Sequence, residues 1–462
     1  MMISINRWKC RHAGLILLGW FWLVTSASAQ PPWDQEQLLQ EPIFNGSVLL
    51  REAGSGNAEI LLLIHGLGHE AADIWEPFVV ELADRFHVIA PDLPGFGGST
   101  RGNQLYSPAN YAEFIHWLLD RYPDKPIYLA GHSLGGAISL HVAARYGERL
   151  ERLILIDAVG TLHRLAVGQH FVRDLIRLDL PFLSREVENR LGQIAELVLE
   201  KTSHIPMDPD LILASAAARE KFLAGDSTRI ASLALVQSDF SLLLPRVKTR
   251  TWLIWGDQDQ IAPVRIATLL DWNLAKSHLT LLSGLGHLPM SEDPPRFITA
   301  LRQALDGAMA GDDIPLMTST SALEDAVCDN QQGRVFSGRF GKLQINNCSD
   351  VLISAAQVTQ LITVDSQVTI ERSLVGNDSQ GIAIQILRSN LTLTGVDVRG
   401  SIGIEADQSR LDLAGVRFFG TPMAVMAVGN PSSVLFSSSF KQVDGKLIPL
   451  QVSRSLRQGE SL

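Results

Sequence analysis

One short stretch of the chain has the residue types and the spacing that an activated serine requires. The segment 131–135 reads Gly-His-Ser-Leu-Gly, between an apolar run at 127–130 that is typical of a strand and a helical pattern at 137–144. A sharp strand-to-helix turn holds a serine hydroxyl clear of the sheet, and glycines avoid collisions where the two elements converge. Free N–H groups at the helix start also favour developing negative charge. Ser133 is therefore predicted to be a nucleophile, the alternative being a chance match in an ordinary turn.

A serine hydroxyl is a weak nucleophile and needs a base, a carboxylate that orients the base, and donors for an oxyanion. His287 directly follows the last apolar run, at 279–282, and is the predicted base. The preceding loop, 255–263, offers two carboxylates, Asp257 and Asp259. The order along the chain is thus serine, acid, histidine, as in a sheet whose nucleophile lies at a strand-to-helix turn.

Short apolar segments alternate with helical patterns through the first two thirds of the chain. This order predicts an α/β fold with a doubly wound, mostly parallel sheet and helices on both of its faces. The polar motifs follow the apolar segments, so they are expected at the carboxyl ends of the strands, where ligand chemistry gathers. The predicted strands are 60–64, 86–90, 127–130, 153–157, 251–255 and 279–282.

As a set, these motifs resemble the α/β-hydrolase superfamily, and within it a lid-bearing, serine esterase-like branch. The resemblance covers about residues 45–305. It is carried by an oxyanion-loop motif, an Asp-x-x-Gly-x-Gly-x-Ser loop, the Gly-x-Ser-x-Gly-Gly turn, an acid loop and a histidine loop. In this order, these motifs lie at 65–68, 92–99, 131–136, 256–263 and 286–287.

The resemblance implies roles for individual residues. Ser133 would be the nucleophile, Asp259 the acid and His287 the base, and the backbone N–H groups of Leu67 and Leu134 would form the oxyanion hole. Asp259 is the carboxylate of the acid loop that matches the family motif. A serine, rather than an aspartate, at the nucleophile position argues against dehalogenase and epoxide hydrolase relatives. No cofactor or metal is expected.

A long insertion, about residues 160–248, interrupts the strand pattern with apolar residues at helical spacing. The superfamily places a helical lid here, and such a lid would wall the pocket with apolar side chains and exclude water. The alternative is that these side chains pack only on one another and on the sheet. The expected helices are 162–180, 185–202, 211–223 and 228–244.

The first 29 residues have the features of an export signal. Basic residues precede an apolar run at 13–24, and Ala-Ser-Ala at 27–29 has the form of a cleavage site. The alternative is an uncleaved membrane anchor, although twelve apolar residues are few for a bilayer. The formal net charge of −10 argues against nucleic acid as a partner. A periplasmic, cell-envelope or secreted protein is expected.

After a predicted hydrolase domain at 33–308 and a linker at 309–325, the composition changes and a repeat begins. Short alternating segments recur at spacings of 23, 20 and 23 residues, each preceded by a serine. A period near twenty with several strands per unit is typical of a β-solenoid. The main copies are 368–370, 391–393, 411–413 and 434–436; a fainter copy is 343–345, and second strands are 382–384 and 402–404.

This repeat resembles a right-handed parallel β-helix, as in pectate-lyase-like proteins, and predicts an all-β domain at 326–450. Leucine-rich repeats and an antiparallel sandwich are the alternatives. The domain is expected to bind a glycan, a cell-envelope component or another protein, or to be a stabilising appendage. Cys328 and Cys348, the cysteines that remain after signal cleavage, could form a disulfide or stay as buried thiols.

The sequence therefore predicts an exported serine hydrolase of the carboxylesterase or lipase type, acting on a small ester with an apolar moiety. Amide, peptide or carbon–carbon bond hydrolysis by the same residues is the first alternative. A non-catalytic envelope- or glycan-binding protein, acting through the β-solenoid, is the second.

Overall fold

The computed structural model describes residues 32–162, 208–307, 323–378 and 381–462. These residues belong to one compact unit, Pro32–Leu462. The predicted export segment at 1–29, the predicted helix at 185–202 and nearly all of that at 162–180 lie outside the described residues, as does most of the predicted linker. Each helix within the described ranges is too short or too polar to cross a bilayer.

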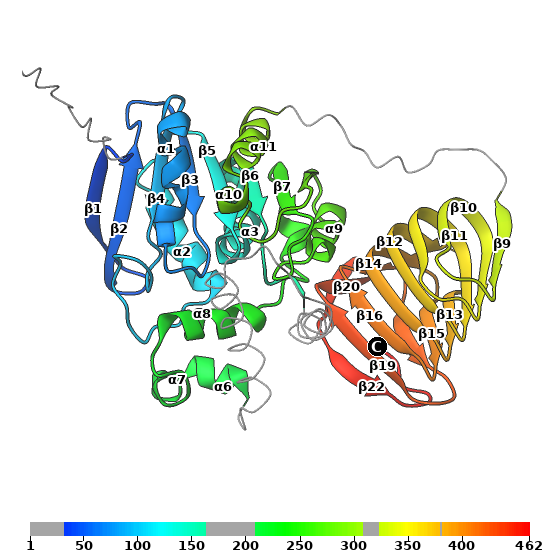
Figure 1. Cartoon of the computed structure of the whole chain (residues 1–462). Helices are drawn as coiled ribbons and strands as arrows, with labels where there is room; N and C mark the ends of the chain where they lie inside the picture. Colours follow the sequence, from blue (N-terminus) through cyan, green and yellow to red (C-terminus); the bar gives the residue numbers. More distant parts are fainter. Residues whose placement is uncertain (1–31, 163–207, 308–322, 379–380) are drawn as a thin grey trace, which may run out of the picture. The chain divides into compact units, whose positions relative to one another are not determined.

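An eight-stranded sheet forms the centre of the N-terminal region, in the order β1-β2-β4-β3-β5-β6-β7-β8 (Figure 1). The strands from β4 to β8 pair in parallel, while β1 and β2 add an antiparallel edge. This mostly parallel α/β sheet confirms the predicted fold class. The strands are β1 Gln35–Glu41, β2 Gly46–Ala53, β3 Glu59–Ile64, β4 Phe86–Pro91, β5 Ile127–His132, β6 Leu150–Ile156, β7 Thr251–Gly256 and β8 Ser277–Leu282.

Alternate residues of each central strand enter two different cores, because successive side chains of a strand point to opposite faces. In β3, Ile60, Leu62 and Ile64 pack with α2, α3 and α9, whereas Leu61 and Leu63 pack with α1 and α11. The sheet is thus covered by helices on both faces, which explains its uninterrupted apolar strands. The helices are α1 Glu76–Ala83, α2 Pro108–Leu119, α3 Leu134–Tyr146, α9 Val264–Asn273, α10 Pro289–Glu292 and α11 Pro294–Asp306.

The described part of the insertion contains α6 Pro209–Ala214, α7 Ala216–Leu223 and α8 Ser227–Val236. The prediction of one helix at 211–223 is wrong at Ser215, whose backbone is extended and whose side chain caps α7 by accepting from the Ala218 N–H. The prediction of a helix to residue 244 is also wrong. Beyond α8, the Asp239 carboxylate accepts from the Ser241 N–H and competes with further helix.

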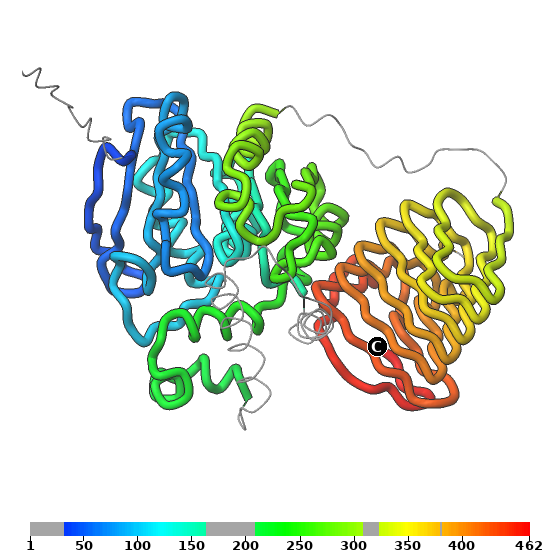
Figure 2. The backbone as a smooth tube through the Cα atoms, viewed as in Figure 1, coloured from blue at the N-terminus to red at the C-terminus, as the bar shows by residue number. Residues whose placement is uncertain are grey.

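The C-terminal region is an all-β, mainly parallel sheet in which successive coils run side by side, as in a β-helix-like domain (Figure 2). Two strands, β21 and β22, pair antiparallel with β20 and β19, and β22 lies beyond the predicted limit of 450. The strands are β9 Glu324–Asp329, β10 Val335–Asn346, β11 Val351–Val364, β12 Gln367–Gly376, β13 Ile382–Leu387, β14 Asn390–Arg399, β15 Ile402–Asp407, β16 Arg410–Ala414, β17 Arg417–Phe419, β18 Met423–Ala427, β19 Ser432–Ser437, β20 Ser439–Val443, β21 Lys446–Leu450 and β22 Ser453–Leu456.

The main repeat copies stack in the register that their spacing predicts. Val368 pairs with Leu391, Leu391 with Leu411, and Leu411 with Val434. The second strands also align, with β13 parallel to β15. The prediction that 343–345 is a fainter copy of the main strands is wrong. Leu343 pairs with Leu361, and Leu361 pairs with Ile384 of β13, so this segment stacks with the second strands.

The serines that precede the main copies form a ladder inside this region. The Ser389 hydroxyl accepts from the Ser366 N–H at 2.9 Å, and the Ser409 hydroxyl accepts from the Ser389 N–H at 3.1 Å. Ser432 accepts from Ser409 in the same way. In each buried turn, a backbone N–H therefore donates to the serine hydroxyl of the next coil. This explains why serine recurs at these positions. One coil earlier, a disulfide joins Cys328 to Cys348 and settles the question of the two cysteines.

Contacts within the compact unit join α9 to the C-terminal strands. The Arg265 guanidinium binds both carboxylate oxygens of Asp412, at 2.7 and 2.9 Å. The Trp272 ring N–H donates to Asp397 at 2.9 Å. Both partners of the ion pair are mostly buried, so α9 is held by charge-assisted bonds as well as by packing.

Candidate active site

The predicted site lies where the strand order of the sheet changes direction. From β3 the chain passes to β4 on one side and then to β5 on the other. Loops at the carboxyl ends of two such neighbouring strands diverge and leave a crevice, which is the usual place for a ligand in open α/β sheets. The segment 65–69 follows β3, and Ser133 follows β5.

Ser133 adopts the strained backbone expected of a sharp turn, with φ of 54° and ψ of −117°. The neighbouring glycines are required by close approach. A Cβ atom on Gly131 would lie 2.3 Å from the Gly135 carbonyl oxygen, and one on Gly135 would lie 2.3 Å from the Ile64 oxygen. A left-handed conformation at a residue other than glycine costs about 1–3 kcal/mol. The surrounding packing of β3, β5 and α3 therefore holds Ser133 in place.

The structure brings together the three side chains that were predicted to act as one unit. His287 Nε2 lies 3.0 Å from Ser133 Oγ, and His287 Nδ1 lies 2.7 Å from Asp259 Oδ2. All three residues are buried. With Nδ1–H donating to the carboxylate, Nε2 is free to accept the serine proton, so the geometry permits general-base activation of the hydroxyl.

The acid loop separates its two carboxylates clearly. Asp259 Oδ1 accepts from the N–H groups of Ile261 and Ala262, which leaves Oδ2 for the histidine. Asp257 turns outward and accepts from the Gly284 N–H at 2.6 Å, a bond that lowers the pKa of its carboxyl. The carboxylate that matches the family motif is thus the one that contacts His287.

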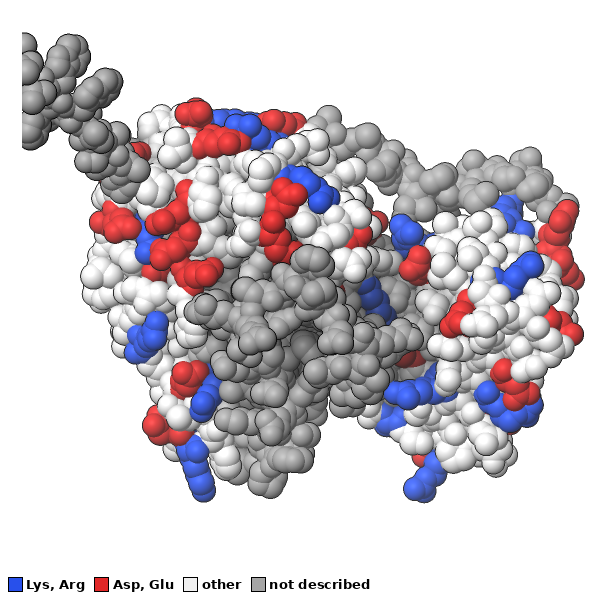
Figure 3. All heavy atoms as spheres, viewed as in Figure 1, with Lys and Arg blue, Asp and Glu red and all other residues white. Residues whose placement is uncertain are grey.

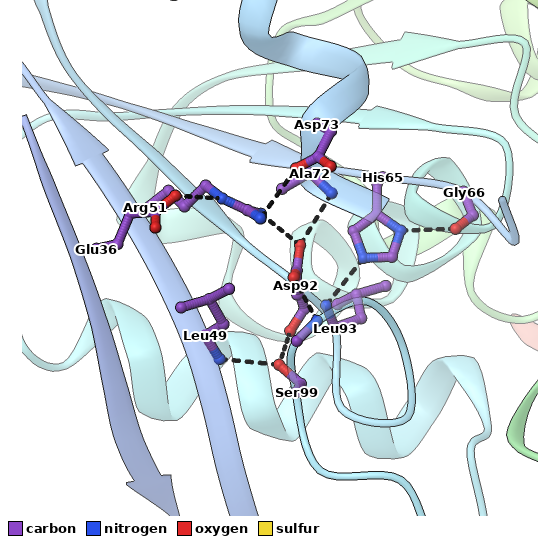
Figure 4. Close-up of polar contacts among 11 residues, drawn as sticks. Glu36, Leu49, Arg51, His65, Gly66, Ala72, Asp73, Asp92, Leu93 and Ser99 are labelled. Atoms are coloured by element: carbon purple, nitrogen blue, oxygen red, sulfur yellow. Dashed lines mark hydrogen bonds and ion pairs between the residues drawn. The ribbon is translucent and has the colours of Figure 1, made fainter. Parts of the chain in front are cut away.

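The predicted oxyanion loop is fixed by His65. Its Nδ1–H donates to the Gly66 carbonyl oxygen at 2.7 Å, and its Nε2 accepts from the Leu93 N–H at 2.9 Å (Figure 4). Burial lowers the pKa of His65 to about 4, so the ring is neutral at pH 7 and both bonds persist. A Cβ atom on Gly66 would lie 2.9 Å from Ser133 Cβ, so this loop passes directly beside the serine. Leu67, whose N–H is a predicted oxyanion donor, is the next residue.

Asp92 anchors the Gly-rich loop that follows β4 (Figure 4). It is fully buried, and its Oδ1 accepts from Arg51 at 2.7 Å and from the Ala72 N–H at 3.0 Å. Its Oδ2 accepts from the Gly98 N–H at 2.8 Å. The Gly-rich loop after β4 is therefore held by a paired carboxylate.

Two residues that support His287 were missed from the sequence. Glu292 accepts from the N–H groups of Gly286 and Leu288, at 2.6 and 3.1 Å, and so clamps the backbone on both sides of the histidine. His132 Nε2 donates to the His287 carbonyl oxygen at 2.8 Å. A glutamate five residues after the histidine, at the end of the short helix α10 that starts at Pro289, was a signal for the first. No local signal marks the second, because the contact spans the sheet.

A cavity of about 330 Å³ opens beside the oxyanion loop. Most of the residues that line it are small or polar, and His69 and Arg101 are among them. The start of α8 forms one side. The described apolar residues of the insertion, such as Ile230 and Leu233, pack instead into the core. Within the described ranges, no group of three or more His, Cys, Asp or Glu side chains is arranged to hold a metal ion.

The strand order, the turn after β5 and the histidine loop after β8 together define an α/β hydrolase. The chain matches the α/β hydrolase fold family model over residues 59–294, and it belongs to that family.

Three relatives illustrate the range of the family. An uncharacterized protein of Mycobacterium tuberculosis is 32% identical over 275 residues, covering 55% of this chain and 77% of that protein. The 2-hydroxymuconate semialdehyde hydrolase of a Pseudomonas species is 28% identical over 273 residues, covering 56% and 91%. Lipase 1 of Psychrobacter immobilis is 25% identical over 245 residues, covering 52% and 75%. The chain is thus similar both to a lipase and to a 2-hydroxymuconate semialdehyde hydrolase.

Proposed function

We propose that this protein is a serine hydrolase that cleaves carboxylic esters through an acyl-enzyme on Ser133. The observation that carries the proposal is the continuous set of contacts from Ser133 through His287 to the Asp259 carboxylate. The similarity to a lipase supports ester substrates. A small ester with an apolar moiety is the proposed substrate.

In the proposed mechanism, His287 Nε2 takes the Ser133 proton as Oγ attacks the acyl carbon. Asp259 holds the imidazole by Nδ1 and stabilises the imidazolium that forms. The backbone N–H groups of Leu67 and Leu134 donate to the oxyanion, a contribution worth on the order of 10²–10³ in rate for each donor. His287 then gives the proton to the leaving alcohol, and a water molecule activated by His287 releases the acid.

Carbon–carbon bond hydrolysis is the second candidate, because the chain is 28% identical to a 2-hydroxymuconate semialdehyde hydrolase. The same serine, histidine and carboxylate would act on a ketone carbonyl, and the leaving group would depart as a stabilised carbanion. Amide or peptide hydrolysis would use these residues too. The bond cleaved, rather than the residues, distinguishes the three reactions.

We also propose that the mature protein acts outside the cytoplasm. The pattern of residues 1–29 supports export, and the Cys328–Cys348 disulfide fits an oxidising compartment. On the face seen in Figure 3, described acidic and basic side chains are interspersed without a broad basic area. A glycan or a cell-envelope component is the proposed partner of the C-terminal region. Signal-peptide removal and periplasmic fractionation of the full chain test the proposal.

The first experiment replaces the nucleophile. The Ser133→Ala protein is expected to lose turnover of short p-nitrophenyl esters by a factor on the order of 10⁴ or more, with its unfolding midpoint retained. Ser291→Ala, at an exposed serine near the histidine loop, is the control and should keep full turnover. Equal activity in the two variants would contradict the proposal.

A second experiment separates a hydrolase from a binding protein. A fluorophosphonate probe should label Ser133 in the wild-type protein but not in Ser133→Ala, because only an activated serine attacks the probe. An absence of labelling would favour the binding function. Matched ester, amide and ketone substrates that share one acyl group would then identify the bond cleaved.

A further inference from the structure

Asp157 is a buried carboxyl group that the proposed mechanism does not use. It directly follows β6, is 0% exposed, and has a left-handed backbone with φ of 42°. Asp259 follows β7, the neighbouring parallel strand, and the two strands are in register at Ile156 and Ile254. Both carboxyl groups therefore lie at the same edge of the sheet. Asp259 contacts His287, and the Asp157 carboxyl is within hydrogen-bonding reach of Asp259.

Gly256 ties these two acids together. The Asp157 Oδ1 atom accepts from the Gly256 N–H at 2.9 Å, while the Asp259 N–H donates to the Gly256 carbonyl oxygen at 3.3 Å. The backbone N–H of Asp157 is used by the Ile254 oxygen at 3.1 Å. The position of Asp157 is thus fixed by main-chain bonds on both sides, independently of its charge.

The second oxygen of Asp157 has an environment that suits a hydroxyl and not a carboxylate. Oδ2 is buried and accepts no hydrogen bond from any residue that the structure describes. Burial first, and then the charge of Asp259, raises the pKa of Asp157 well above its usual range; Glu292 acts in the same direction. The charged groups that act on Asp157, Asp259 and Glu292, are both carboxylates. A second buried negative charge, on Asp157 beside Asp259, would therefore be strongly disfavoured.

We propose that Asp157 keeps its proton and is a positioning residue, its carboxylic acid directed at the Asp259 carboxylate behind His287. Asp259 then remains the ionised member of the pair and accepts from His287, from two backbone donors and from Asp157. The proton stays on Asp157 throughout the reaction, so no additional transfer step is needed. This inference rests on the proposed function only in what Asp259 and His287 do.

The neutral form can be tested by substitution with asparagine, which has nearly the same shape and no charge. In Asp157→Asn, the amide can still accept from Gly256 and donate to Asp259. The rate of fluorophosphonate labelling should stay within about threefold of wild type, and the pH midpoint of its acid limb should not move. If Asp157 were ionised, the variant would remove a negative charge near the imidazolium and shift that midpoint to lower pH, which would overturn the proposal.

Asp157→Ala removes the donor as well as the charge. Its labelling rate should fall by about tenfold or more, because Asp259 loses one of the groups that fix it behind His287. Rescue of this loss by asparagine, with an unmoved acid limb, supports a neutral positioning role. Equal loss in the asparagine and alanine variants would contradict it.

A third measurement is independent of any activity. The difference infrared spectrum of wild type minus Asp157→Asn should contain the carbonyl stretch of a protonated carboxylic acid at neutral pH. A carboxylate band in its place would overturn the proposal even if both proteins were fully active. Conversely, if the wild-type protein failed to react with the probe, the proposed function would fail while this band still decided the state of Asp157.

Discussion

The site of the N-terminal region is assembled from loops that each occur once and lie far apart in the chain, whereas the C-terminal region repeats one kind of contact from coil to coil. Ser133 and His287 are 154 residues apart, yet their side chains meet. The serines of the ladder are separated by only 20 or 23 residues and each contacts the next. The first region concentrates its specificity in a few atoms, and the second distributes its stability over many equivalent positions.

This difference predicts different consequences of substitution. A change at one site residue should remove chemistry with little effect on folding, because its neighbours remain packed. A change in one coil should lower stability with little effect on chemistry, because the coils interact mainly with the coils beside them. The contacts of α9 with β14 and β16 are the place where this separation could fail.

The largest expected effect is on activity, at Asp259. Asp259→Asn should lower turnover by a factor on the order of 10⁴, because an amide favours the wrong imidazole tautomer. Asp257→Asn, two residues away, is the matched control and should retain most of the activity, since Asp257 binds Gly284 and not the histidine. Ester turnover of both variants at pH 8 gives the comparison. If Asp257→Asn were the more damaged protein, the assignment of the acid would be wrong.

The next effect is on stability, inside the coils. Phe418 is fully buried and packs edge-on against Phe436, with ring centroids 6.0 Å apart. Phe418→Ala should lower the free energy of unfolding by about 3–5 kcal/mol, because it leaves a cavity that the stacked strands cannot fill. Denaturant titrations followed by far-ultraviolet circular dichroism measure the loss.

The neighbouring Phe419 provides the control for this change. Its side chain is half-buried and lies beside Arg399 and Arg417 rather than in the core. Phe419→Ala should therefore cost much less than Phe418→Ala. Reduced ester turnover of folded Phe418→Ala would show that the two regions are coupled, and Arg265 on α9 would be the first residue to replace in order to locate the coupling.

Much of the N-terminal fold and site could be predicted because the signals are local. Apolar runs such as 60–64 mark buried strands, and Gly131 and Gly135 mark a turn that other residues cannot form. The loops that follow parallel strands must gather at one edge of the sheet, so Ser133 and His287 could be expected to meet. The repeat could also be predicted from the sequence, because its spacing equals the length of one coil.

The features that were missed depend on non-local contacts. The copy at 343–345 has the right residue pattern, yet only the pairing of Leu343 with Leu361 shows which ladder it joins. Asp157 ends an apolar strand without any motif, and its role depends on Asp259, which lies about a hundred residues further on. The break at Ser215 arises from a side-chain cap that competes with helix at a single residue. Periodicity alone does not resolve such competition.

The smallest effect concerns acid, and it too should distinguish the regions. Burial is the first cause that lowers the pKa of His65 to about 4, of His132 to about 3 and of His141 to about 4. The sequence has no histidine after residue 287. These buried rings stay neutral in the fold at a pH where the unfolded chain, with an ordinary value near 6.5, binds protons. Acid should therefore weaken the N-terminal region first.

Proton linkage gives the sign and size of this change in the free energy of unfolding. Above pH 6.5 the contribution of these histidines is constant; as the pH falls from about 6.5 toward 4, each lowers the free energy of unfolding by about 1.4 kcal/mol per pH unit. The raised pKa of Asp157 acts in the opposite direction, because its buried carboxyl group binds a proton that the unfolded chain releases.

Tryptophan fluorescence isolates the N-terminal region, because the last tryptophan is Trp272. As the pH is lowered, the unfolding midpoint followed by tryptophan fluorescence should fall more steeply than the midpoint followed by the circular dichroism of the β-rich region. His141→Gln should make that fall shallower by about 1.4 kcal/mol per pH unit, since one buried titrating ring is removed. His116→Gln, at a half-buried histidine on α2, is the matched substitution for comparison. Equal acid sensitivity of the two spectroscopic signals would mean that the regions unfold as one unit, and the α9 contacts, rather than the histidines, would then set the acid response of the whole chain.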